Sequence, residues 1–270
     1  MHGSGSAWPR RQDYRAAVGP GNDTFTFANT GTLGGKVVGG GHTTKDTVDL
    51  SAKVGAVAIN LQTNSVTGVA GTVTGVNSFV GNDGTAGANT TFTGGNAGSA
   101  YVLTGVNSGT IDGTSSFAGV GNLVDGSGND SFVLSGGTLI GSIDGGAGTN
   151  TLTGDNVVNT WGITAPNTGT VTGISGGFSN IQNLKGGTNT DTFTLASGVA
   201  TFNGSIAGCG GTDTLGTTDG KNTWVITGAK SGTLNTSTVF SGIEKLTDGT
   251  RTVHVFWLGW WRWVMLLIFR

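Results

Sequence analysis

The fold is decided by NTWGITAPNTGTV, residues 159–171, because the chain contains this block three times. SAYVLTGVNSGTI occupies 99–111 and NTWVITGAKSGTL occupies 222–234. The aromatic residues of the three copies, Tyr101, Trp161 and Trp224, therefore recur at an interval of about 60 residues. Self-similarity at a fixed period is the sequence signature of repeat architectures.

Three further blocks recur in the same order. FAGVGNL begins at Phe117, FSNIQNL at Phe178 and FSGIEKL at Phe240, and D-[ST]-F occurs at 130–132 and at 191–193. IDGGAGTNTL (143–152) is matched by IAGCGGTDTL (206–215). The interval of roughly 60 residues that these blocks share defines one repeat unit. Turns that contain Asp or Asn recur inside it after about 20 residues, which predicts three coils per unit.

The composition favours short strands joined by tight turns. Of 270 residues, 53 are Gly and 3 are Pro, and charged residues make up 10%. Apolar residues alternate with Thr in NTWVIT and DTFTL, as in strands with one face inward. We therefore predict an all-β fold, a right-handed parallel β-helix with about 20 residues per coil and irregular termini. The expected domain covers 19–250.

The two ends differ from this middle. Residues 1–18 are expected to be irregular, and they lack the apolar run of a signal peptide. All six Arg lie in the ends, whereas 19–250 contain seven Lys and fourteen acidic residues, a formal charge of −7. Such a surface argues against nucleic acid as a partner. Residues 251–270 form a Trp-rich apolar tail, either an anchor touching a membrane through 253–269 or an out-of-frame artefact.

The middle resembles the large repetitive exoproteins of bacteria, the filamentous-haemagglutinin-like and autotransporter-passenger adhesins. GGAGTNTLTG (145–154), NTWGIT (159–164), FSNIQNLKGG (178–187) and NTDTFTL (189–195) carry the resemblance. It implies an extracellular or outer-surface location and a scaffold role in adhesion or biofilm. The implied partners are surface glycans or proteins of the host or of bacteria.

A second resemblance is to the haemolysin-type calcium nonapeptide, G-G-x-G-x-D-x-U-x. GGAGTNTLT (145–153) and GCGGTDTLG (208–216) match it imperfectly, as do three other stretches. The resemblance implies calcium as the cofactor, with Asp23, Asp130, Asp191 and Asp213 as candidate ligands. The alternative is that these Gly-Asp turns serve backbone geometry alone and that the protein has no cofactor. A calcium-stabilised repeat module is therefore the second functional hypothesis.

A polysaccharide-active enzyme is the third hypothesis, and we expect no catalytic residues. Glycoside hydrolysis usually needs two carboxylates, yet Asp112, Asp144 and Asp155 form no recognisable pair. His42 is expected to be a turn residue, and Cys209 an unpaired thiol. Trp161 and Trp224 are expected to be core residues because of their place in the repeat.

Overall fold

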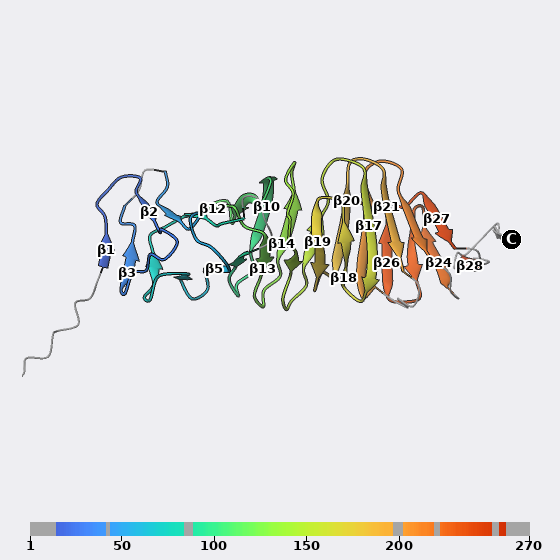
Figure 1. Cartoon of the computed structure of the whole chain (residues 1–270). Coiled ribbons are helices and arrows are strands. Elements are labelled where there is room, and N and C mark those ends of the chain that lie inside the picture. Colours follow the sequence, from blue (N-terminus) through green and yellow to red (C-terminus); the bar gives the residue numbers. More distant parts are fainter. Residues whose placement is uncertain are drawn as a thin grey trace, which may run out of the picture.

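The computed structural model describes residues 15–41, 44–83, 89–196, 202–218, 222–249 and 254–257. All regular elements within these ranges are β-strands, stacked along one elongated body (Figure 1). No helix that could cross a membrane occurs in this part of the chain. The predicted all-β class is confirmed. His42 and most of the expected terminal segments, 1–18 and 251–270, lie outside the described residues.

The strands form three hydrogen-bonded sheets of 14, 11 and 3 strands. Across the 14-stranded sheet lie β2 (Thr24–Thr26), β4 (Thr47–Asp49), β8 (Ser78–Val80), β12 (Ser115–Ala118), β11 (Ser108–Ile111), β10 (Ala100–Gly105), β14 (Ser131–Leu134), β16 (Thr151–Thr153), β20 (Asn183–Gly187), β22 (Gly204–Cys209), β26 (Thr238–Ser241), β25 (Ser231–Leu234), β24 (Thr223–Gly228) and β28 (His254–Trp257). Across the 11-stranded sheet lie β27 (Lys245–Asp248), β23 (Thr214–Thr217), β21 (Asp191–Leu195), β17 (Asn159–Ala165), β18 (Thr168–Val171), β19 (Ile174–Ser179), β15 (Ile143–Asp144), β13 (Asn122–Val124), β9 (Thr90–Thr93), β5 (Val57–Asn60) and β6 (Ser65–Val66). The small sheet contains β1 (Arg15–Ala17), β3 (Lys36–Val38) and β7 (Val73–Thr74).

From β12 onward the chain crosses back and forth between the two long sheets. β13 and β15 pair in parallel in one sheet, and β14 and β16 pair in parallel in the other. Leu123 lies beside Ile143 in the first pair, and Phe132 lies beside Leu152 in the second. Both pairs confirm, for these strands, the expected coil of about 20 residues.

The repeated block itself departs from the expected uniform coil. β17, β18 and β19 form an antiparallel meander, as do β10 to β12 and β24 to β26. The meander lengthens the interval between parallel neighbours on the opposite sheet, so that the next partner of Leu152 is Leu184. A uniform coil of one length is therefore wrong wherever a meander is inserted. Asn167, in the first turn of the β17–β19 meander, has a φ of 56°, and its carbonyl accepts the Ile181 amide.

The repeated aromatic block lies in one long sheet in one repeat unit and in the other long sheet in the next. Tyr101 and Trp224 lie in the 14-stranded sheet, whereas Trp161 lies in the 11-stranded sheet. Between Tyr101 and Trp161 the chain crosses five times, through β12–β13, β13–β14, β14–β15, β15–β16 and β16–β17. Three coils of two strands each would need six crossings, so the predicted three coils per unit is wrong.

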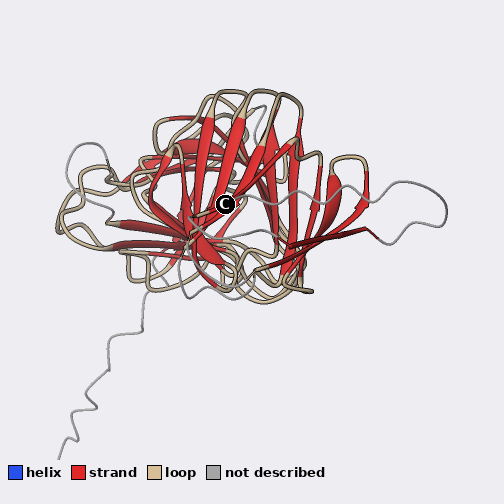
Figure 2. Cartoon of the chain, turned by 90° about the vertical axis from the view of Figure 1, so that its right-hand side faces the viewer, coloured by secondary structure: helices blue, strands red, loops and turns tan. Residues whose placement is uncertain are grey.

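The core lies between the sheets and follows the predicted alternation. In β17, Trp161 and Ile163 are buried whereas Thr160 is exposed. The Trp161 ring stacks on Phe193 with centroids 5.3 Å apart, and Tyr101 stacks on Phe132 at 4.8 Å. Trp161 and Trp224 are fully buried, which confirms them as core residues. Figure 2, viewed from the C-terminal end, shows the strands one behind another with loops between them.

Candidate functional site: the aspartate-lined corners

Three of the four predicted calcium ligands lie where the chain turns a corner into a strand. Asp130 and Asp213 immediately precede β14 and β23, and Asp191 is the first residue of β21. Each uses Oδ1 to accept a backbone N–H from the neighbouring strand: Asp130 from Ser99 at 2.8 Å, Asp191 from Asn159 at 2.9 Å and Asp213 from Asp191 at 2.8 Å. All three are at most 2% exposed. Stacking brings Asp191 beside Asp213, and Asp130 beside Asn150, as expected for Asp- and Asn-containing turns that recur after about 20 residues.

These bonds belong to ladders that continue along the body and include residues other than the four predicted ligands. The further acceptors are Asn150 for the Asp130 amide (2.9 Å), Gln182 for Asn150 (2.7 Å), Glu244 for Asp213 (2.6 Å), Asp46 for Asp23 (2.9 Å) and Asn77 for Asp46 (3.1 Å). Asp23, the fourth predicted ligand, is half-buried and contributes its backbone amide. A signal that identifies such residues is a side-chain carbonyl or carboxylate directly before a strand.

Asn150 shows what its corner requires of a side chain. Its Nδ2 donates to the carbonyl oxygens of Gly145, Ala147 and Asn180, at 2.7, 3.2 and 2.9 Å. Asn159 occupies the equivalent position in another corner, where its Nδ2 donates to two carbonyls of its own turn. The inner end of the side chain thus lies among carbonyl oxygens, and an amide N–H satisfies them.

Asp213 places an oxygen where Asn150 places a nitrogen. A Cβ on Gly145 would lie 2.6 Å both from Asn150 Nδ2 and from the Asn180 oxygen. A Cβ on Gly208 would lie 2.3 Å from Asp213 Oδ2 and 2.2 Å from the Gly242 oxygen. A carboxylate oxygen and a carbonyl oxygen, both hydrogen-bond acceptors, therefore face the same glycine.

Asp191 repeats this arrangement. A Cβ on Gly186 would lie 2.2 Å from Asp191 Oδ2 and 2.5 Å from the Gly208 oxygen. Oδ2 of Asp130, Asp191 and Asp213 is buried without a hydrogen-bond partner among the described residues. Burial raises the pKa of all three carboxyls, against the hydrogen bonds that lower it. Each corner therefore favours a proton or a cation beside Oδ2.

A corner formed by Asp125 and Tyr101 adds a second carboxylate beside Asp130. Asp125 is 5% exposed, Tyr101 is fully buried, and Asp125 Oδ1 accepts the Gly126 amide at 2.8 Å. Burial, together with the nearby Asp130, raises the pKa of Asp125 to about 6, against hydrogen bonds from Gly126 and Ser99 that lower it. Asp125 is not among the calcium ligands predicted from the sequence.

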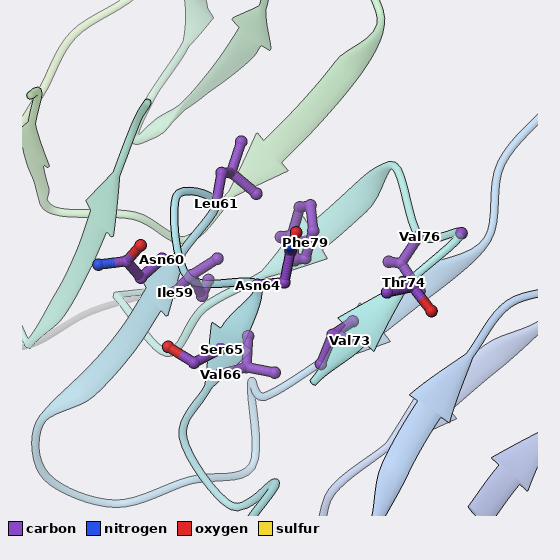
Figure 3. A pocket seen from close by; sticks show the side chains of 11 residues that line it. Ile59, Asn60, Leu61, Asn64, Ser65, Val66, Val73, Thr74, Val76 and Phe79 are labelled. Atoms are coloured by element: carbon purple, nitrogen blue, oxygen red, sulfur yellow. The ribbon is translucent and has the colours of Figure 1, made fainter. Parts of the chain in front are cut away.

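The other candidate features are a small cavity and a free thiol. A cavity of about 70 Å³ between β5, β6, β7 and β8 is lined mainly by apolar and small polar residues, such as Ile59, Val73 and Phe79 (Figure 3). None of its lining residues is titratable. Cys209 is a free, exposed thiol. Within the described ranges, no group of three or more His, Cys, Asp or Glu side chains is placed to hold a metal ion.

Comparison of the chain with protein-family models, with curated proteins and with solved structures gives no match.

Proposed function

We propose that the chain is a structural rod, a right-handed parallel β-helix that serves as scaffold in a secreted or surface-displayed bacterial adhesin. The observation that carries this proposal is that buried acidic and amide side chains accept hydrogen bonds from the backbone of adjacent strands. Asp130, Asp191, Asp213 and Asn150 each hold a backbone amide of the adjacent strand. Such ladders stabilise stacking from strand to strand, which is what a rod needs.

The outward faces support the same role. Thr160, Thr192 and Thr214 lie in register on three adjacent strands of the 11-stranded sheet, and all are exposed or half-exposed. Neighbouring parallel strands are about 4.8 Å apart, so these hydroxyls form a regular row. A row of small polar groups offers hydrogen bonds to glycans or to extended protein segments, the partners that we propose for an extracellular location.

Adhesion of protein-coated beads tests this proposal. Beads coated with the full chain should bind to bacterial or host cell surfaces, and a T192E/T214E variant should reduce that binding. Thr192 and Thr214 are half-exposed, so the variant is expected to keep its strand circular-dichroism signal. Equal binding by beads coated with either protein or with albumin would refute the adhesin role. X-ray scattering from the same protein would separately test the elongated shape.

A calcium-stabilised module is the second candidate, favoured by the Oδ2 atoms of Asp191 and Asp213, for which the described residues supply no hydrogen-bond partner. Calcium prefers oxygen ligands, and these corners offer carboxylate and carbonyl oxygens. Thermal unfolding with calcium and with chelator tests it. A rise in melting temperature that disappears in a D191N/D213N variant supports this candidate. Identical melts with calcium and chelator reject it and leave the metal-free rod.

A further inference from the structure

Three residues at the corner that joins β13 to β14 each have a buried oxygen atom for which the described residues supply no hydrogen-bond partner. These atoms are the Tyr101 hydroxyl, Asp125 Oδ2 and Asp130 Oδ2. A Cβ on Gly94 would lie 2.3 Å from the Tyr101 hydroxyl and 2.4 Å from Asp125 Oδ1, so the phenol and the carboxylate face the same small space. The Asp125 and Asp130 carboxyls are close enough for each to shift the other's affinity for protons. One corner therefore holds two carboxylates and a phenol.

The next repeat unit has neither of the two added oxygen-bearing groups. The repeated blocks FAGVGNLVDG and FSNIQNLKGG align Asp125 with Gly186. Trp161 replaces the tyrosine, so an indole stands in place of the phenol. Of the positions equivalent to Tyr101, Asp125 and Asp130, only the last has a carboxylate in that unit, and this carboxylate is Asp191. The changes at 101 and 125 together convert a corner with one carboxylate into one rich in oxygen.

A second comparison shows what surrounds a carboxylate at this position in the third block. The third block, FSGIEKLTDG, aligns Asp248 with Asp125. Oδ1 of Asp248 accepts from the Thr217 hydroxyl and from Asn222 Nδ2, at 2.5 and 2.9 Å. Its Oδ2, like Asp125 Oδ2, is buried without a partner among the described residues. In the Asp125 corner, Gly94 stands in place of Thr217 and has no side-chain donor. Asp125 accepts hydrogen bonds from Gly126 and Ser99 instead, and the charged groups that act on the Asp125 and Asp130 carboxyls are themselves carboxyls, Asp130 and Asp112.

We propose that Asp125, Asp130 and the Tyr101 hydroxyl bind a hard divalent cation such as Ca²⁺. Hard cations prefer carboxylate, carbonyl and neutral oxygen ligands, and two carboxylates balance the charge of one divalent ion. The cation compensates for the burial of two like charges, which is otherwise costly. This site does not depend on the rod proposal, and it is separate from the corners of Asp191 and Asp213.

Calorimetric titration and thermal unfolding of the chelator-treated full chain with CaCl₂ test the site. Calcium should raise the melting temperature of the wild type and of D191N. It should not raise the melting temperature of D125G, which lacks the second carboxylate of this site. Glycine occupies the equivalent position in the next unit, so D125G is expected to fold. Y101F keeps the ring that stacks on Phe132 and removes one oxygen; it should weaken binding by about 10- to 100-fold.

Two results would overturn the proposal. If D125G binds calcium as the wild type does and D191N does not, the ion belongs to the single-carboxylate corners. The second result is that calcium changes the melting temperature of neither the wild type nor D125G, and that D125G melts at a higher temperature than the wild type at pH 7. The carboxyl pair then holds a proton and no cation. D125N replaces D125G in both comparisons if the glycine variant does not fold.

Discussion

Replacing Asn150 with Asp tests directly whether the corner needs a hydrogen-bond donor. The substitution keeps the oxygen that accepts the Asp130 amide and removes an NH₂ group that donates to three carbonyls, at 2.7 to 3.2 Å. An unsatisfied buried group costs about 1–3 kcal/mol, and each lost hydrogen bond about 1 kcal/mol. Protonation of the new carboxyl at pH 7 would cost about 4 kcal/mol, because its usual pKa of about 3.9 lies roughly three units lower. We expect the free energy of unfolding to fall by about 3–4 kcal/mol at pH 7.

The pH dependence of N150D follows from the same geometry. The folded state favours the protonated carboxyl, so its folded pKa lies above the unfolded value, and stability is retained below about pH 4 and lost as pH rises through the folded pKa. Urea unfolding in chelator, monitored by circular dichroism, measures the loss in the free energy of unfolding at pH 7 and at pH 4. N129D is the matched control, since Asn129 is exposed and accepts the Thr149 amide through Oδ1. An N150D loss below about 1 kcal/mol at pH 7, or an equal loss at both pH values, would refute the reasoning.

Three further substitutions probe the corners and the core. D191N should raise the free energy of unfolding by about 1 kcal/mol in chelator at pH 7, because its amide can donate to the corner carbonyls; a loss in the same urea titration would contradict this. G186A should lower the melting temperature, since the added Cβ would lie 2.2 Å from Asp191 Oδ2, whereas G95A, with nothing within 4 Å, should melt like the wild type. W161A should cost about 3–5 kcal/mol in urea unfolding, and a loss below about 1 kcal/mol would mean that the stack on Phe193 contributes little.

Strand positions and core residues could be predicted from the sequence because they depend on local periodicity. The alternation in NTWGIT predicts Trp161 and Ile163 inside and Thr160 outside, and this is what the structure shows. The stacking of Asp191 beside Asp213 also followed, since their spacing matches one circuit of the two sheets. The meanders were missed because alternation does not distinguish parallel from antiparallel neighbours. The turn at Asn167, a residue type tolerant of positive φ, was the available signal.

The corner chemistry was only half predictable. Gly-Asp turns drew attention to Asp191 and Asp213, but a metal motif selects carboxylates and passes over Asn150, which occupies the same position. Asp125 was missed for the opposite reason, since it stands where the motif requires Gly. The spacing of the turns does place Asn150 beside Asp130, but the donor role of Asn150 and the place of Asp125 in the corner become visible only when the strand register shows which side chains share a corner.

The odd number of crossings per repeat unit has a geometric consequence for the elongated body (Figure 1). A meander adds strands to one sheet only. The three strands β17, β18 and β19 lie opposite β16 and β20, which are directly hydrogen-bonded neighbours in the other sheet. At about 4.8 Å per strand, the two extra strands lengthen one side by about 10 Å and would bend the body. Five crossings put the next meander, β24 to β26, on the other sheet, where it lengthens the opposite side. A unit with six crossings would put every meander on one sheet and lengthen only that side, whereas five crossings distribute the extra strands over both sheets.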